Sequence, residues 1–289
     1  MGKIQTTHVG SLPRSQAVVD FIFARENGEF YDPEKFQTCM KEAVAETVRK
    51  QVSAGIDMVS DGEMSKISYA TYVKDRYHGF SGDSPRNAPN DLKLFPGYLE
   101  RIANSGGTPK YARPMCTNAI ISKGQDDLLR DIANLKTAMA GRDHISGFMN
   151  AASPGVISLF LQNSYYPSRE EYLQALADAM RAEYETIVNA GLILQLDCPD
   201  LALARHMLFT DLSDEEFVKV AEQHIRVLNE ALRNIDPNRV RVHICWGNYE
   251  GPHVCDIAMD KVFGVLMQVR ARYVLFETSN PRHAHEWTV

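Results

Sequence analysis

Apolar residues recur with a helical spacing in several long segments of the chain. Between residues 33 and 54 they stand four positions apart, and Gly55 follows the last of them: Phe36, Met40, Val44, Val48 and Val52. This spacing places them on one face of a helix, and a glycine after the last turn is a common helix end. Ser213 and Glu216 form a capping-box pattern at the start of another helix. We predict amphipathic helices at 33–54, 126–140, 169–190, the stretch that begins at Ser213, and 257–269.

Short apolar runs with strand character lie between these helices. The run LILQLD after Gly191 is too continuous for a sheet with one solvated face, and it is typical of a parallel strand buried on both faces. We predict seven strands, near 4–10, 56–63, 111–121, 144–150, 192–200, 239–248 and 271–280. Strands that alternate with helices indicate a parallel sheet, and the chain length matches a (β/α)8 barrel. The predicted fold is an α/β TIM barrel that lacks the eighth strand and the last helix.

The domain organisation follows from the absence of any composition shift. We predict one barrel domain over residues 1–289, interrupted by a long irregular connection at 81–109 that is rich in Gly, Pro, Asn and Ser. The last residues, which include His283, His285 and Glu286, are predicted to be a solvated tail.

The composition narrows the classes of partner. The 289 residues carry a formal net charge of −6, without the basic stripe that favours nucleic acid. No apolar run is long enough to span a membrane, and the N-terminus lacks the apolar region of a signal peptide. The five cysteines have no disulfide-framework spacing, which favours a reducing compartment. We therefore expect a soluble cytoplasmic protein that acts on small molecules.

Polar side chains stand at the ends of the apolar runs. In chain order these ends carry Ser11, Glu63, Asp197, His243 with Cys245, and Glu277. The carboxyl ends of parallel barrel strands meet at one mouth, where active sites are assembled. One acidic residue after a strand is more often a helix cap, but the same pattern at five strand ends favours a site.

The residue types at two of these ends favour a metal ion. His243 and Cys245 are two positions apart, so both face the same side of a strand, and Glu277 ends the next strand. Imidazole nitrogen, thiolate sulfur and carboxylate oxygen are all zinc ligands. Taken alone, the pair is more often a core histidine beside a buried cysteine. With zinc bound, the site could activate a thiol, which indicates alkyl transfer to sulfur.

The motifs resemble one known family. TTHVGSLPR, SDGE, LQLDCPDLALAR, VHICWGN and LFETS are similar, in this order, to the strand-end motifs of the cobalamin-independent methionine synthases. The similarity is to their C-terminal catalytic barrel, and it extends to zinc alkyltransferases such as the epoxyalkane:coenzyme M transferases. The resemblance implies a zinc-dependent methyltransferase of methionine biosynthesis, of the 5-methyltetrahydropteroyltriglutamate–homocysteine type.

The resemblance also implies roles for single residues. His243, Cys245 and Glu277 match the metal ligands, with Zn²⁺ as the cofactor. The Gly10-Ser11 turn, Glu63 and Asp197 match positions that hold the amino-acid end of the thiol substrate. We therefore predict Gly10, Ser11, Glu63 and Asp197 as substrate-binding residues, and Glu63 and Asp197 also as catalytic.

Departures from the family leave alternatives open. The family's last zinc ligand is a cysteine on the eighth strand, whereas this sequence ends at Val289, so we expect a truncated barrel with an exposed sheet edge. The acceptor could be homocysteine or another small thiol such as coenzyme M, and the methyl donor is not specified. A metal-free decarboxylase of the same fold and a non-catalytic binding barrel are the other hypotheses. The oligomeric state is not specified either.

Overall fold

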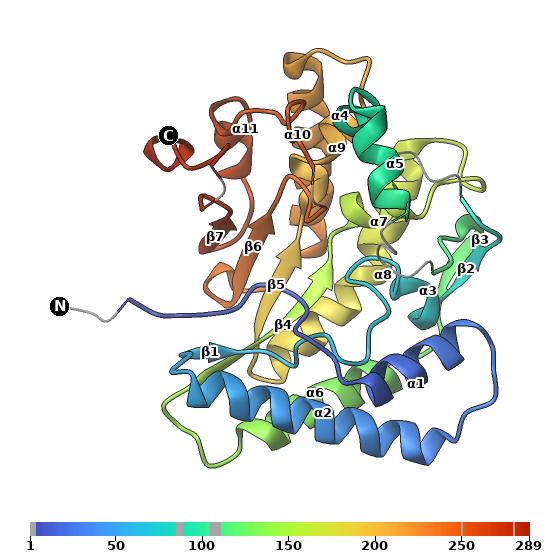
Figure 1. Ribbon diagram of the computed structural model, residues 1–289, viewed down its shortest axis with the longest axis vertical. Coiled ribbons are helices and arrows are strands. Elements are labelled where there is room, and N and C mark those ends of the chain that lie inside the picture. Colours follow the sequence, from blue (N-terminus) through green and yellow to red (C-terminus); the bar gives the residue numbers. More distant parts are fainter. Residues whose placement is uncertain (1–3, 85–88, 105–110, 250, 280) are drawn as a thin grey trace.

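A curled parallel sheet forms the centre of the protein (Figure 1). The computed structural model describes residues 4–84, 89–104, 111–249, 251–279 and 281–289. The sheet has five strands in the order β1–β4–β5–β6–β7, and each pairs in parallel with its neighbours. Their carboxyl ends therefore lie along one edge. The strands are β1 (Met58–Val59), β4 (Ser146–Ala152), β5 (Ile193–Asp197), β6 (Val240–Ile244) and β7 (Tyr273–Phe276).

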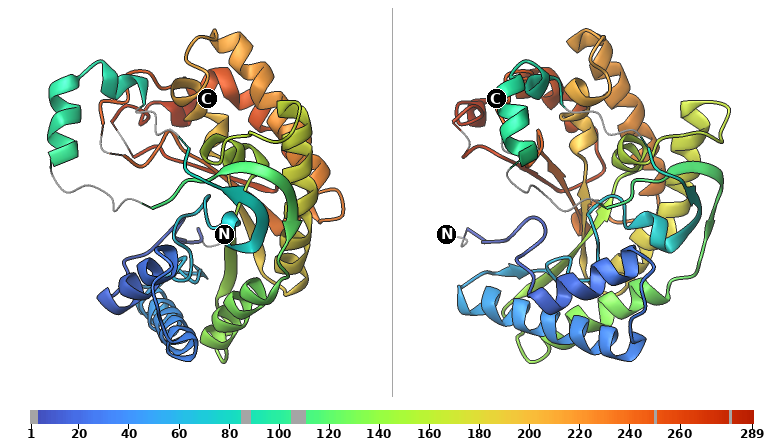
Figure 2. Two further views of the ribbon diagram at one scale, coloured as in Figure 1. Left: turned by 90° about the vertical axis from the view of Figure 1, so that its right-hand side faces the viewer. Right: turned by 45° about the vertical axis from the view of Figure 1, so that its right-hand side comes forward.

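Helices alternate with the strands along the chain and pack around the sheet (Figures 1 and 2). The predicted helices at 33–54, 126–140 and 169–190 are confirmed to within a residue, and so is the capping box of Ser213 and Glu216. No helix in the described part of the chain is both long and apolar enough to cross a membrane. These helices are α2 (Pro33–Ser53), α6 (Asp126–Met139), α8 (Arg169–Asn189), α10 (Asp214–Ala231) and α11 (Met259–Leu266).

The shorter elements connect and flank this framework. Near the N-terminus, α1 packs against α2, and α7 packs against α8 and α10. The other helices are α1 (Gln16–Glu26), α3 (Val73–Arg76), α4 (Asn90–Lys93), α5 (Pro96–Asn104), α7 (Pro154–Phe160) and α9 (Ala204–Met207), with 3₁₀ turns η1 (Pro199–Leu201), η2 (Pro237–Arg239) and η3 (Glu286–Thr288).

The strand predicted at 111–121 is not part of the parallel sheet. It forms β3 (Met115–Ser122), which pairs antiparallel with β2 (Tyr77–Ser81) in a separate two-stranded sheet. Most of β3 is exposed or half-buried, whereas a parallel strand such as β5 is covered on both faces. Segment 4–10 contributes only a single bridge, from Thr7 to Met58. The described residues thus form a curled half barrel. Five of the seven predicted strands lie in the parallel sheet, and the prediction of barrel strands at 4–10 and 111–121 is wrong.

Two predictions about irregular regions also need correction. The connection at 81–109 contains α4 and α5, while residues 85–88 and 105–110 lie outside the described part of the chain. The final stretch is not a solvated tail, because His283 and Glu286 are buried; His285 is exposed as predicted.

Candidate active site

A cavity of about 710 Å³ opens at the carboxyl ends of the parallel strands. It is lined by residues from the N-terminal segment, the loop after β1, and the ends of β5, β6 and β7. Every site residue predicted from the sequence lies on its wall: Gly10, Ser11, Glu63, Asp197, His243, Cys245 and Glu277. Tyr69, which sequence analysis did not single out, lines it as well. The fold therefore gathers in one cavity the side chains that the sequence scatters over five strand ends.

Asp197 and His243 form the best-ordered pair in the cavity. They face each other across the β5–β6 register, and His243 Nδ1 lies 3.0 Å from Asp197 Oδ1. Asn150 Nδ2 donates to Asp197 Oδ2 at 2.9 Å, and Gln195 Nε2 donates to Oδ1 at 2.9 Å. The carboxylate is thus held from two strands and in turn orients the imidazole. The other ring nitrogen of His243, Nε2, has no hydrogen-bond partner among the described residues, which is how a metal-binding histidine is usually prepared.

A layer of polar side chains lies one pleat below this pair, and sequence analysis missed it. Arg241 Nε donates to Gln195 Oε1 at 2.8 Å, and its other nitrogens reach Thr7 Oγ1 at 3.0 Å and the His8 carbonyl at 3.1 Å. Burial lowers the pKa of Arg241 to about 10. Asn150 and Gln195 each donate to the carbonyl of Val9. This layer ties the N-terminal segment to β4, β5 and β6 beneath the cavity.

Glu63 is held in the loop after β1 with an unusual backbone conformation. Its φ of 58° is in the left-handed region, and its N–H donates to Asp61 Oδ1 at 2.9 Å. Arg14 Nη2 donates to the carbonyl of Glu63 at 2.8 Å. A Cβ on Gly10 would lie 3.8 Å from Glu63 Oε1, so the predicted N-terminal turn lies against this carboxyl group.

The environment of Glu63 favours its neutral form until a cation arrives. Burial, and then the charge of Asp197, raise the pKa of Glu63 to about 8, against the opposing charge of Lys66. A ligand ammonium placed between Glu63 and Asp197 would compensate both carboxylates. The pair is therefore chemically suited to a positively charged group.

Cys245 and Glu277 lie just beyond the ends of β6 and β7. Burial raises the pKa of the Cys245 thiol to about 12. Together with His243 they offer sulfur, oxygen and nitrogen donors on one cavity wall, and this donor set fits zinc in chemistry. Across the residues that the structure describes, no three His, Cys, Asp or Glu side chains already stand close enough to hold a metal ion. The predicted zinc ligands thus share a cavity without forming a ready-made metal cluster.

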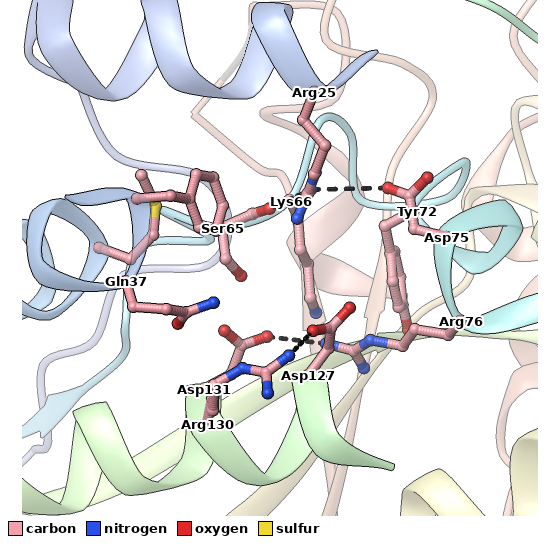
Figure 3. Close-up of a pocket in the computed structure, with 12 residues that line it drawn as sticks. Arg25, Gln37, Ser65, Lys66, Tyr72, Asp75, Arg76, Asp127, Arg130 and Asp131 are labelled. Carbon is pink, nitrogen blue, oxygen red and sulfur yellow. Dashed lines mark hydrogen bonds and ion pairs between the residues drawn. The ribbon is translucent and has the colours of Figure 1, made fainter. Parts of the chain in front are cut away.

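A second, much smaller cavity is lined in part by Ser65 and Lys66, which follow Glu63 closely in the chain (Figure 3). Its volume of about 30 Å³ leaves room for no more than a few water molecules. Arg76 pairs with Asp131 and with Glu183, each at 2.8 Å, and Tyr72 also donates to Glu183 at 2.5 Å. These charges are compensated internally, so this cavity supports the loop after β1 and offers no room for a substrate.

Comparison with known proteins agrees with the motifs. Residues 4–83 match the family model of the cobalamin-independent synthase catalytic domain. The methionine synthase of Sulfolobus acidocaldarius is 24% identical over 262 residues, which cover 90% of this chain and 67% of that protein. The methionine synthase of Saccharolobus solfataricus is also 24% identical, over 90% of this chain and 68% of that protein. The resemblance to cobalamin-independent methionine synthases is confirmed.

The fold has a solved counterpart. A B12-independent methionine synthase from Shewanella sp. W3-18-1, solved in complex with selenomethionine, superposes with a TM-score of 0.66 at 17% identity. The match covers 93% of this chain and 72% of that chain. The α/β architecture with its curled parallel sheet is therefore shared with that protein.

Proposed function

We propose that this protein transfers a methyl group to the thiol of homocysteine, forming methionine, with zinc and without cobalamin. One observation carries the proposal: the cavity joins a buried acidic pair, Glu63 and Asp197, to a wall with an imidazole, a thiol and a carboxylate. The first set suits the ammonium group of an amino acid, and the second suits a thiol-activating metal. The similarity to methionine synthases supports the same conclusion.

The acidic pair discriminates between acceptor thiols. Homocysteine carries an α-ammonium group that Glu63 and Asp197 can bind. Coenzyme M carries a sulfonate and no ammonium group, so its charge would be repelled by the same carboxylates. A decarboxylase substrate that carries carboxylates and no ammonium group meets the same repulsion, whereas the α-ammonium group of homocysteine offsets the charge of its own carboxylate. The pair therefore favours an amino-acid thiol over both alternatives.

The residues of this chain have separate tasks in the proposed reaction. Asp197 fixes the ring of His243, and His243, Cys245 and Glu277 would hold the metal. When bound, zinc supplies the acidity that leaves the substrate thiol as a thiolate at neutral pH. As the ammonium binds, Glu63 gives up its proton, because the cation favours the charged carboxylate. The sulfur–methyl bond then forms as the bond between methyl and donor breaks.

The proposal extends to the fold and to the setting of the protein. On this proposal the half barrel is part of a (β/α)8 barrel, and residues 1–289 form one catalytic domain with the connection at 81–109 inserted. All five cysteines are free thiols, which supports a reducing compartment such as the cytoplasm. Its partners are then a small thiol and a methyl donor.

Elemental analysis of purified protein beside a Cys245→Ser variant tests the proposal. We expect about one zinc per chain in the parent protein and a clear loss in the variant. Equal zinc content in both would contradict the proposed ligand set. Homocysteine and coenzyme M, offered as acceptors to the zinc-loaded protein, then separate the two thiol hypotheses.

A further inference from the structure

Cys245 is not held by the hydrogen-bond ladder of the sheet. β6 ends at Ile244, so the thiol belongs to the connection that leads to α11. The next residue, Trp246, is only 1% exposed, and its indole N–H donates to the carbonyl of Ile257 at 2.7 Å. Trp246 therefore anchors the chain immediately beside the thiol.

His283 packs flat against this tryptophan. The two ring centroids are 4.0 Å apart with an interplanar angle of 19°. His283 Nε2 lies 2.8 Å from Asp256 Oδ2, and Nδ1 lies 2.8 Å from Glu286 Oε2. Both ring nitrogens are thus fixed by carboxylates. The stretch expected to be a solvated tail instead supplies the surface on which Trp246 rests.

Asp256, which contacts His283, also lies close to the imidazoles of two other histidines. His253 Nδ1 lies 2.9 Å from Asp256 Oδ2, and His206 Nε2, from α9, lies 3.2 Å from Oδ1. Burial alone would raise the pKa of Asp256, but the three imidazoles hold it well below its usual range. A carboxylate that favours its ionised form is therefore buried among His206, His253 and His283.

The same connection is attached to α4 of the inserted segment. Asp91 is fully buried and accepts hydrogen bonds from the Tyr249 hydroxyl at 2.6 Å and from the His253 N–H at 2.8 Å. His253 has a φ of 53°, a conformation that non-glycine residues adopt only when their surroundings impose it. The segment between β6 and α11 is thus held in place by side chains from distant parts of the chain.

We infer that His283, Asp256 and Glu286 are positioning residues, which fix the Cys245 thiol at the cavity by clamping Trp246. The inference rests on the proposed function only in treating Cys245 as part of the active site. His283, Asp256 and Glu286 thus fix the position of Cys245, as strand pairing and the polar layer around Arg241 fix the position of His243. This makes the metal-binding wall dependent on residues near the C-terminal end of the described chain.

A matched pair of variants tests this inference. His283→Gln removes the stacked, doubly bonded ring, and His285→Gln makes the same change two residues away at an exposed side chain. Metal-free protein is treated briefly with iodoacetamide under native conditions, and the modification of each cysteine is measured by mass spectrometry. Cys198, which is buried in the core, reports global unfolding.

We expect alkylation of Cys245 to rise about tenfold in His283→Gln, because release of Trp246 opens the segment locally. Alkylation of Cys198 should stay at the parent rate, and His285→Gln should match the parent protein. Emission from Trp246, isolated by Trp287→Phe, should shift to longer wavelength only in His283→Gln. A His283→Gln protein with parent-like Cys245 alkylation and Trp246 emission overturns the inference.

Three further variants keep the test decisive. Glu286→Ala removes the hydrogen bonds of this carboxylate to His283 and to the Met259 N–H, whereas the amide of Glu286→Gln can bond to both and should retain most of the protection. If His283→Gln does not fold, Trp246→Phe replaces it, and the same selective rise at Cys245 is expected. Neither readout needs zinc or methyl transfer, so failure of the proposed function appears separately, as parent protein without zinc.

Discussion

The two walls of the cavity are held in different ways. Asp197 and His243 lie in neighbouring ladder positions, above a layer in which Arg241 and Gln195 are bonded to each other. Cys245 and Glu277 lie beyond the strand ends, and Glu277 follows an edge strand whose Tyr273 is 51% exposed. The strand ladder thus fixes Asp197 and His243 from within the sheet. The positions of Cys245 and Glu277 depend on connections and on contacts outside the sheet.

Removing the polar layer should give the largest effect on stability. Arg241→Met removes the donor from the buried acceptor of Gln195 and from the half-buried acceptors of Thr7 and His8. We expect the free energy of unfolding to fall by about 3 kcal/mol, since each buried unpaired group costs about 1–3 kcal/mol. Urea denaturation measures it, with the exposed Arg272→Met as the control. A loss no larger than the control's would show that the layer does not hold the wall.

Loss of the carboxylate that orients His243 should act on the metal more than on the fold. Asp197→Asn removes the charge that holds His243 Nδ1. Such partners of a ligating histidine typically change metal affinity about 10- to 100-fold, and we expect a decrease of that size. Competition with a chromophoric chelator measures it. Unchanged zinc affinity would separate Asp197 from the metal site.

The carboxyl group of Glu63 should make stability depend on pH in an unusual direction. Its pKa is raised from 4.5 to about 8, so the folded state retains a proton that the unfolded state releases above pH 4.5. The stability that this proton contributes is fully present below pH 4.5 and is lost as pH rises through 8. The advantage of Glu63→Gln over the parent protein should therefore grow between pH 5 and pH 8.

Urea midpoints at the two pH values measure this effect, and Glu222→Gln, exposed on α10, is the matched control. The same Glu63→Gln change should weaken homocysteine binding, so the residue would favour function at the expense of stability. An advantage that is equal at both pH values would contradict the raised pKa.

The smallest effect on stability is expected at the metal-binding wall. Glu277→Gln changes a side chain beyond an edge strand, so the free energy of unfolding should stay within about 0.5 kcal/mol of the parent value. Zinc content should nevertheless fall. A stability loss like that of Arg241→Met would remove the difference between the walls.

More of the candidate site than of the fold could be predicted from the sequence. Strand-end polarity in runs such as LQLD and VHIC is local, and it led to cavity-lining residues because parallel strands end along one edge. The helices could be predicted equally well, since the spacing of apolar residues and caps such as Ser213 are local signals. The pairing of β3 was not, because a short apolar run does not reveal which strand it will join.

The residues that sequence reasoning missed are polar, and they lie within strands or in the last stretch of the described chain. Gln195 and Arg241 stand two positions before Asp197 and His243, so their side chains face the same way, a signal that was present. No comparable pattern in the sequence indicates that His283 is buried. Its burial depends on Asp256 and Trp246, which lie far away in the sequence.

The central claim is that the cavity binds a thiol through both its sulfur and its α-ammonium group. The most direct measurement is calorimetric titration of the zinc-loaded protein with homocysteine and with 4-mercaptobutanoate, the same thiol without the amino group. The account predicts that homocysteine binds at least about tenfold more tightly, and that Glu63→Gln removes most of this difference. Equal affinity for the two thiols in the parent protein would contradict it.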